Sequence, residues 1–352
     1  MLNFMLILFE ISYIREDFLL DINNVLKALC SEGGVSGNEK AAAEVALSYL
    51  KKYDENAFIK NNSVFATIGN GEKKVLLDAH IDRIGFIVTH ITEDGFLKVA
   101  PCGGIDKRFL PALQLIIHGK KDIAGTVVSI PPHLASDNKP LDFDEAYIDT
   151  GYSKEEVEKI VSLGDNVSFF SPFAELLGTR VSASALDDRS GVAVILYALE
   201  LLSKENINCT LQILFSSEEE VGERGAATGA FSFNPDIAIA VDVSFAYASG
   251  EKEEKCGKMG KGAMIGIAPS LDRELSNELI NIAREKNIPY QIEVMNGRTG
   301  TNADRFAINR EGALSSTISI PLKYMHTPVE VVDTKDIISC AELIAEYVKG
   351  VK

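Results

Sequence analysis

The spacing of apolar residues divides the chain into three stretches of different character. In the first, helical periodicity runs from Asp17 to Cys30 and, after a glycine-containing turn, from Asn38 to about Tyr53, with Asn38 as the expected cap of the second helix. Alanines between positions 41 and 46 strengthen the second prediction, because alanine has the highest helix propensity. A short apolar run, Lys74 to Leu77, then predicts a buried strand.

From about Gly85 to Phe173 the pattern becomes that of a small, mostly β module. Short runs rich in β-branched and aromatic residues predict strands, and the connections between them carry Gly, Pro and Asp. Only Ser153 to Ser162 predicts a helix in this stretch. The predicted strands are Phe86–His90, Leu97–Ala100, Gln114–His118, Thr126–Ile130 and Asn166–Phe170.

After Leu186 predicted strands and helices alternate, which indicates a sheet with helices on both faces. The fold class expected is therefore α/β, with a central mixed sheet flanked by helices. We expect a discontinuous α/β domain made of residues 15–84 and 174–352, split by an inserted β-rich domain of residues 85–173. The predicted elements are helix Ser190–Leu202, strand Thr210–Phe215, strand Ile237–Val241, helix Leu271–Lys286, strand Ala313–Ile320 and helix Thr334–Val348.

The composition describes an acidic globular protein. Of 352 residues, 46% are apolar, which is ample for a full-sized core, and the formal net charge is -16. An acidic protein repels polyanions, so neither nucleic acid nor a membrane surface is an expected partner. The five cysteines are scattered and show no CxxC spacing, a pattern typical of reduced thiols in a cytoplasmic protein.

Residues 1–14 form an apolar extension, MLNFMLILFEISYI, whose role the sequence leaves open. Glu10 interrupts the run, no lysine or arginine precedes Arg15, and no small-residue cleavage site follows, so a signal peptide is a poor fit. A membrane span needs about 20 apolar residues, so the segment is too short to cross a bilayer. An extra strand, a docking segment, and a start codon assigned too early, with Met5 as the true start, all remain open.

Chemistry-bearing residues gather where the predicted strands end. Apolar runs lead directly into acidic or imidazole side chains, and a pair of aspartates opens a predicted helix. In open α/β sheets, ligands bind outside the carboxyl ends of the strands, so these clusters should converge on one rim. The clusters are His80 with Asp82, Asp187 with Asp188, Glu218 with Glu219 and Glu220, Asp242, and His326.

Each cluster taken alone has an ordinary structural explanation. A single histidine is more often a core residue, an aspartate pair at a helix start is often a cap, and a run of glutamates is usually a solvated turn. Together they are harder to explain, because carboxylates stacked at one rim repel one another unless a cation is present. Imidazole and carboxylate ligands suit zinc, cobalt or manganese better than calcium, so the sequence predicts a metal site.

The remaining histidines, His90, His118 and His133, fall in the predicted β module. We interpret them as structural or surface residues, since they lie away from the clusters at the strand ends.

The ordered motifs HIDRIG, ALDDRSG, EEEVGERGA, AVDVS and YMHTPVE resemble those of the co-catalytic di-zinc aminopeptidases. The branch they resemble contains the glutamyl and deblocking aminopeptidases that build tetrahedral (TET) particles. The resemblance extends from about Asp17 to near the end of the chain and includes VSGNE at residues 35–39 and GTNAD at residues 300–304. It implies a zinc-exopeptidase-like fold, and an inserted domain that forms dimers which assemble into a dodecamer.

The resemblance also implies two divalent metal ions per subunit, zinc first and cobalt or manganese as alternatives. One ion would take His80 and Asp242, the other Glu220 and His326, and Asp187 would bridge the two.

Three further features are implied by the resemblance alone. Asp82 would hydrogen-bond the second ring nitrogen of His80 and fix its tautomer. Glu219 would be the general base that activates a metal-bridging water. The peptide bond between Asp187 and Asp188 would be cis.

The chain departs from the family pattern at three places. Arg83 stands where an acidic residue is usual, Lys323 stands where Arg is usual, and GTNAD replaces the commoner GTDA. We expect the last two changes to lie near the substrate end, which leaves the preferred first residue open. Cations that could select acidic residues, or equally lie on the surface, are Lys258, Lys261, Arg298, Arg305 and Lys323.

The function expected is removal of amino-terminal residues from short peptides. Two alternatives remain open: a metal-dependent deacylase acting on N-acyl amino acids, and an inactive homologue that kept only the assembly. A glycosidase is not expected, because glycosidases use two carboxylates around a sugar rather than a metal pair.

Overall fold

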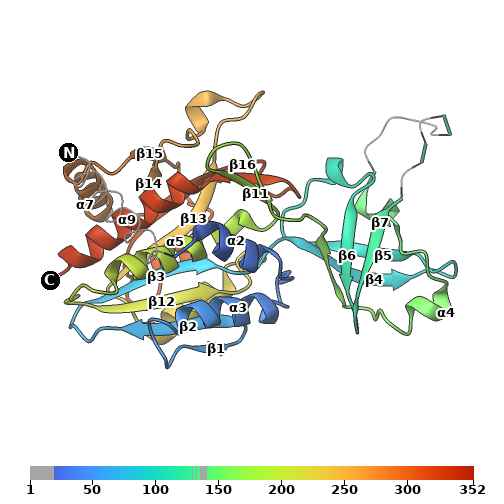
Figure 1. Cartoon of the computed structure of the whole chain (residues 1–352), viewed down its shortest axis with the longest axis horizontal. Coiled ribbons are helices and arrows are strands. Elements are labelled where there is room, and N and C mark those ends of the chain that lie inside the picture. The colour runs from blue at the N-terminus through green and yellow to red at the C-terminus, as the bar shows by residue number, and fades with distance from the viewer. Residues whose placement is uncertain (1–19, 129, 132, 135–140) are drawn as a thin grey trace, which may run out of the picture.

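The computed structural model describes residues 20–128, 130–131, 133–134 and 141–352. The apolar segment 1–14 and the predicted helix start at Asp17 lie outside these residues. The described chain forms a large α/β part and a smaller β-barrel, which lie side by side in Figure 1. This arrangement confirms the predicted fold class.

Four parallel strands form the centre of an 11-stranded sheet. Strand β3 (Lys74–His80) pairs with β12 (Thr210–Ser216) on one side and β13 (Ile237–Phe245) on the other, and β13 pairs with β16 (Leu314–Lys323). All four have long buried runs, as expected for strands covered on both faces. Because they are parallel, their carboxyl ends meet at one edge of the sheet.

Antiparallel and shorter strands extend this centre in both directions. The order along the sheet is β1-β2-β12-β3-β13-β16-β17-β11-β10, with β14 joining β16 to the edge strand β15. The additional strands are β1 (Phe58–Lys60), β2 (Ser63–Ile68), β10 (Ala174–Glu175), β11 (Arg180–Ala183), β14 (Ala263–Ile267), β15 (Tyr290–Val294) and β17 (Glu330–Asp333).

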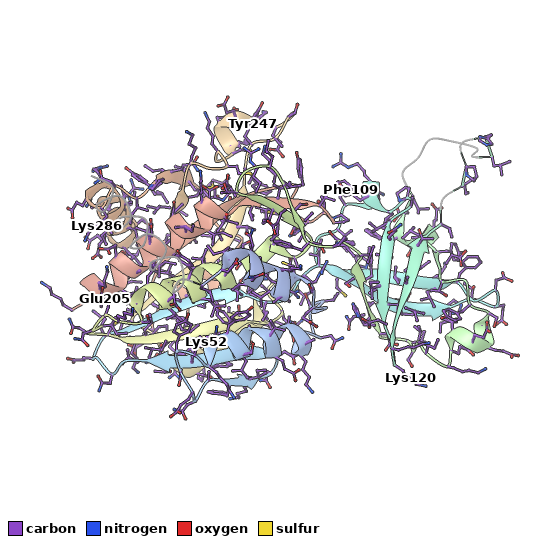
Figure 2. All side chains as sticks on the ribbon, viewed as in Figure 1. Lys52, Phe109, Lys120, Glu205, Tyr247 and Lys286 are labelled. Atoms are coloured by element: carbon purple, nitrogen blue, oxygen red, sulfur yellow. The ribbon has the colours of Figure 1, made fainter. Side chains whose placement is uncertain are left out.

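Helices cover both faces of the sheet. The larger core lies under the nearly fully buried helix α5 (Leu186–Leu202) and under α9 (Thr334–Gly350), which pack against each other. Side chains fill the layer between these helices and the strands (Figure 2). The remaining helices are α2 (Ile22–Cys30), α3 (Lys40–Leu50) and α7 (Arg273–Glu285) near the larger core, and α6 (Arg224–Phe233) and α8 (Ala303–Phe306) over the smaller core on the opposite face.

The barrel follows β3 almost at once, because only residues 81–84 separate His80 from its first strand. Its strands close in the order β4-β5-β8-β7-β6-β9 around a separate hydrophobic core. The chain returns to the large sheet through β10 and β11. The elements of this part are β4 (Gly85–Ile91), β5 (Leu97–Cys102), β6 (Gln114–His118), β7 (Asp122–Val127), β8 (Ile148–Asp149), β9 (Asn166–Phe169) and helix α4 (Lys154–Val157).

Several predicted element boundaries were wrong. Helix α3 is preceded by Glu39 rather than Asn38, and its cap has no side-chain hydrogen bond. Strand β7 starts at Asp122 rather than Thr126, because a tight turn pairs Asp122 with His118 of β6. The predicted helix Ser153–Ser162 is shortened to α4. The pattern did not predict β1, β2, β14, β15, β17 or α6.

Within GTNAD, Gly300 and Thr301 line the cavity at the carboxyl edge of the sheet, whereas the asparagine itself is buried against β3 and β12. Asn302 is buried and donates hydrogen bonds through Nδ2 to Asp78 Oδ2 (2.7 Å) and Ser216 Oγ (2.8 Å). The aspartate of the commoner motif would place a second carboxyl group against Asp78. The amide is therefore a donor that the buried Asp78 needs, and this departure from the family pattern concerns stability.

We expect replacement of Asp78 by Asn to change how stability depends on pH. Burial raises the pKa of Asp78 to about 7, so the native state binds a proton more tightly than the unfolded chain, and the wild type loses stability as the pH rises from about 4 to about 7. D78N lacks this titration, so its stability relative to wild type should grow with pH by up to about 1.4 kcal/mol per pH unit. Urea unfolding across this range checks the prediction, and identical pH profiles for both proteins would contradict it.

Candidate metal centre

The residues at the strand ends converge on the carboxyl edge of the parallel strands. His80 is the last residue of β3, and Glu219 and Glu220 lie in the turn that follows β12. Asp187 lies in the first turn of α5, where the backbone is not yet helical, and the Asp187–Asp188 peptide bond is cis.

Asp242 does not follow a strand, as the sequence analysis placed it, but lies inside β13, which continues to Phe245. Pairing between β3 and β13 ends at Asp78 and Ala240, although both strands continue. His80 and Asp242 therefore face each other where the two strands part, and this parting leaves room for a ligand between them.

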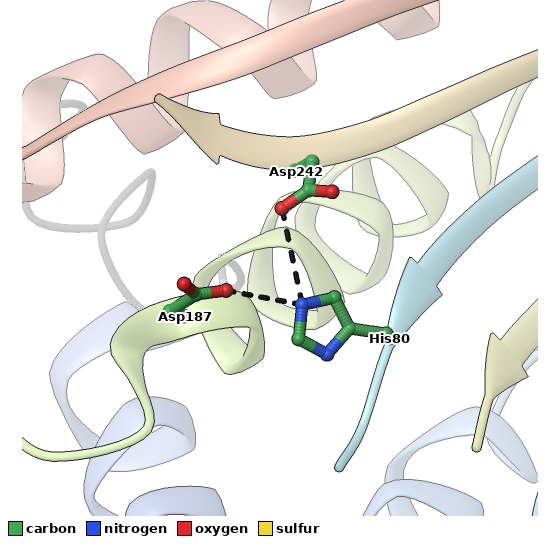
Figure 3. Close-up of side chains that lie close together, drawn as sticks. All are labelled: His80, Asp187 and Asp242. Atoms are coloured by element: carbon green, nitrogen blue, oxygen red, sulfur yellow. Dashed lines mark hydrogen bonds and ion pairs between the residues drawn. The ribbon is translucent and has the colours of Figure 1, made fainter. Parts of the chain in front are cut away.

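The first donor group consists of His80, Asp187 and Asp242, which Figure 3 shows around the imidazole ring. His80 Nε2 lies 3.0 Å from Asp187 Oδ1 and 3.9 Å from Asp242 Oδ1. All three side chains are buried. The ring nitrogen of His80 thus points at two carboxylates that arrive from different elements of the sheet and helix layers.

The second donor group consists of Asp187, Glu220 and His326. His326 Nε2 lies 3.3 Å from Asp187 Oδ2 and 3.4 Å from Glu220 Oε2. Its other nitrogen, Nδ1, lies 2.8 Å from the carbonyl oxygen of Gly104, in the segment after β5. Asp187 therefore offers one carboxylate oxygen to each group, and a barrel residue orients the imidazole of the second group.

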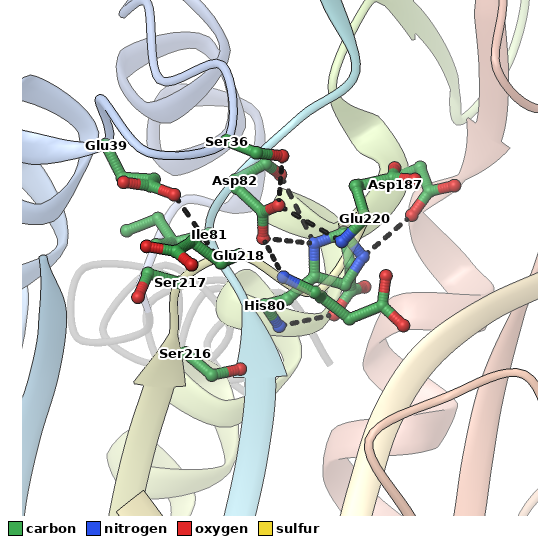
Figure 4. A network of polar contacts seen from close by, with 12 residues as sticks. Ser36, Glu39, His80, Ile81, Asp82, Asp187, Ser216, Ser217, Glu218 and Glu220 are labelled. Carbon is green, nitrogen blue, oxygen red and sulfur yellow. Dashed lines mark hydrogen bonds and ion pairs between the residues drawn. The ribbon is translucent and has the colours of Figure 1, made fainter. Parts of the chain in front are cut away.

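Asp82 connects His80 of the first donor group with the backbone of Glu220 of the second (Figure 4). Its Oδ1 lies 3.3 Å from His80 Nδ1 and accepts a hydrogen bond from the backbone N–H of Glu219 at 3.0 Å. Its Oδ2 accepts from the backbone N–H of Glu220 at 3.2 Å and from Ser36 Oγ at 2.6 Å. His80 Nδ1 also lies 3.2 Å from the backbone carbonyl oxygen of Asp82, so Asp82 orients His80 through its backbone and its carboxylate, and the carboxylate holds the backbone that carries both glutamates.

Burial and charge repulsion shift the pKa values in this cluster. Burial, reinforced by neighbouring carboxylates, raises the pKa of Asp242 to about 8 and that of Glu219 to about 9. Burial alone would lower the pKa of His80, but Asp187 and Asp82 outweigh it and hold the pKa well above its usual value. Carboxyl and imidazole groups with raised pKa values hold protons that they would otherwise release. A bound cation could supply this positive charge instead and would therefore stabilise the cluster.

The donor atoms fit a transition metal. Within each group, one ligand atom from every residue lies within 4.8 Å of the others, and the donors are imidazole nitrogens and carboxylate oxygens. Zinc, cobalt and manganese accept this mixture, whereas calcium prefers oxygen alone.

A cavity of about 810 Å³ opens onto both groups and onto Glu219. Of the cations that the sequence analysis named, Arg298 lines this cavity, whereas Lys258 pairs with Glu253 and Arg305 pairs with Glu223. Residues from β13, β14 and β15 also line the cavity. The cavity is large enough for several amino-acid residues.

Arg83 is buried, although the charge of this position is reversed relative to the family pattern. Its Nη2 donates a hydrogen bond to Ser184 Oγ at 2.6 Å, and its guanidinium lies over the ring of Phe169 at 5.9 Å. Arg83 is not among the residues that line the cavity at the metal-ligand groups.

The sequence analysis missed three residues that support the site. Ser36 and Glu39 belong to the VSGNE motif, and Glu39 accepts hydrogen bonds from the backbone N–H groups of Gly37 and Glu218. Glu330 ends the YMHTPVE motif, and its carboxylate accepts from backbone groups of two candidate ligands. Their presence inside the recognised motifs was the only available signal.

This fold, with imidazole and carboxylate donors clustered at the carboxyl edge of its sheet, defines the class of α/β metallohydrolases. Residues 62–343 match the family described as M42 glutamyl aminopeptidase. The chain belongs to this family, which confirms the resemblance seen in the motifs, and it is a hydrolase of the aminopeptidase class.

Individual relatives are similar over nearly the whole chain. The lysyl aminopeptidase of Pyrococcus furiosus is 32% identical over 337 residues, which cover 93% of this chain and 97% of the relative. The structure of aminopeptidase APDkam598 from Desulfurococcus kamchatkensis has a TM-score of 0.89 and 33% identity, over 94% of this chain and 95% of that chain. The TET1 peptidase of Pyrococcus horikoshii, described as able to assemble into a tetrahedron or a large octahedral shell, has a TM-score of 0.85 and 30% identity, over 94% of this chain and 100% of that chain.

Within the described part of the chain, no helix combines the length and the apolar character needed to cross a bilayer.

We expect replacement of Asp82 by Ala to weaken binding of divalent zinc about 10- to 100-fold, because groups that orient metal ligands contribute on this scale. The change leaves His80 Nδ1 with the backbone carbonyl of residue 82 as its remaining partner, at 3.2 Å, and leaves the backbone N–H groups of Glu219 and Glu220 without their acceptor. Competition with a chromogenic chelator measures the affinity. S36A removes one hydrogen bond to the same carboxylate and should have a smaller effect, and an unchanged affinity in D82A would contradict the assignment.

Proposed function

We propose that the chain is a metal-dependent aminopeptidase that removes amino-terminal residues from short peptides. The observation that carries the proposal is the pair of donor groups that share Asp187, with Glu219 beside both groups in one cavity. Membership in an aminopeptidase family supports the same function. The acyl-amino-acid deacylase remains the second candidate, since it would use the same donors.

The site would hold two divalent metal ions, zinc first and cobalt or manganese as alternatives. His80 and Asp242 would hold one, Glu220 and His326 the other, and Asp187 would bridge them through its two oxygens. Bound metal ions supply a Lewis acid for the scissile carbonyl and lower the pKa of a bound water.

Glu219 would act as the general base. Its backbone is held by Asp82, and its side chain lines the cavity next to the donor groups. It would remove a proton from the attacking water and then deliver that proton to the nitrogen of the leaving amine.

We also propose that subunits assemble through the barrel, in line with residues 85–173 being an inserted dimerisation domain. A Pyrococcus horikoshii relative is described as a dodecamer, and a dodecamer built from dimers is the assembly proposed for this chain. The proposed location is the cytoplasm, which suits the scattered, unpaired cysteines.

Replacement of Glu219 by Gln should lower kcat by about 100- to 10,000-fold, the range that a general base contributes, and should leave the metal content unchanged. The amide keeps the shape of the side chain and cannot take the proton. Glu218, the preceding residue, offers a matched control. Its carboxylate forms an ion pair with Arg224, at 3.8 Å, and has no part in the proposed reaction. E218Q should keep most of the activity, whereas near-wild-type kcat in E219Q would overturn the role of Glu219.

A substrate panel separates the candidate functions. After chelator treatment and addition of zinc or cobalt, we expect cleavage of aminoacyl-p-nitroanilides with a free amine and no cleavage of their N-acetylated forms. The reverse result would identify a deacylase. No cleavage in either series, together with no bound metal, would identify an inactive homologue.

A further inference from the structure

Glu330 is a buried carboxylate at the start of β17 that the proposed reaction does not use. It is 2% exposed, and its two oxygens accept hydrogen bonds from two separate segments. Glu330 Oε1 accepts from the backbone N–H of His326 at 3.0 Å, and Oε2 accepts from the backbone N–H of Asp187 at 3.2 Å. Both donors belong to proposed metal ligands, which lie 139 positions apart in the sequence.

The two segments that Glu330 joins both have unusual backbone conformations. His326 and Tyr324 have φ values of 60° and 61°, in the left-handed region that side chains other than glycine rarely adopt. Ala185, two residues before Asp187, has a φ of 68°. His326 lies after the end of β16, and Asp187 lies within the range of α5 but has non-helical φ and ψ values, so individual hydrogen bonds help to hold both residues in place.

Glu330 itself is firmly placed. It pairs with Ala183 in the ladder between β11 and β17, and the following residues of β17 pair with the end of β16. The backbone that carries this carboxylate is therefore held by pairing of β17 with β11 on one side and with the end of β16 on the other. A group held this way can fix the distance between the two segments.

We propose that Glu330 is a positioning residue that sets the separation of Asp187 and His326 and thereby completes the second metal site. The inference rests on the proposed function, because it takes Asp187 and His326 as ligands. Glu330 does not touch substrate or metal. It acts through the two backbone amides, and the site it controls most directly is the one formed by Asp187, Glu220 and His326.

Two substitutions remove the hydrogen bonds in steps. E330Q keeps one carbonyl oxygen and turns an N–H₂ group toward the other amide, so one of the two bonds is lost. E330A loses both. We expect the zinc ion held by Asp187, Glu220 and His326 to bind about 10- to 100-fold more weakly in E330A, with E330Q in between, because supporting groups of metal ligands contribute on this scale.

The chain contains a matched control in Asp336 of α9. This buried carboxylate also accepts two backbone hydrogen bonds, from Gly260 at 2.6 Å and Gly262 at 2.7 Å, in a turn that carries no proposed ligand. D336N should lower the melting temperature, as the Glu330 variants do, and should bind zinc like the wild type. The comparison separates a loss of stability from a loss of metal positioning.

The experiment is a zinc titration of the chelator-treated full-length proteins against a competing chromogenic chelator, with the melting temperature measured in parallel. Two zinc ions per wild-type subunit, and weakened binding of one of them in the Glu330 variants, support the proposal. Wild-type affinity for both ions in E330A overturns it, as does a wild type that binds fewer than two. If wild type binds two ions and cleaves no peptide, the proposed function fails while the role of Glu330 is still decided by the titration.

Discussion

Repulsion among carboxylates at one edge of the sheet is the constraint around which the structure is organised. Asp187, Glu219, Glu220 and Asp242 lie close together and partly or fully out of water, so each disfavours the charge of the others. Such a cluster is stable only when positive charge enters it. The parting of β3 from β13 and the non-helical start of α5 provide the space, and Asp82 holds the surrounding backbone in place.

The fold and the composition of the site could be predicted because both follow from local patterns. Alternating apolar runs and helical periodicity located β3, β12 and α9 closely, since long buried elements leave a strong periodic signal. His80, Glu220 and His326 could be placed together because the ends of parallel strands meet at the same edge. The order of the motifs then indicated the family.

The residues that could not be predicted act between segments that are distant in the sequence. Asn302 donates to Asp78 across 224 positions, and Glu330 reaches Asp187 across 143. No periodicity encodes such contacts. Asp242 was misplaced for a different reason. The polar residue interrupts an apolar run and was taken as the end of the strand, but β13 continues beyond the point where its pairing with β3 ends.

The barrel is joined to the site at more than one point. It begins five residues after His80, the carbonyl of Gly104 faces Nδ1 of His326, and Ser171 donates to the carbonyl of Pro328 in the same loop. A movement of the barrel relative to the sheet would therefore displace one imidazole from each donor group at once. If subunits assemble through the barrel, as proposed, contacts between them would restrict this movement. Assembly would then affect the reaction by holding the donor groups in place, with no change in the chemical groups of the site.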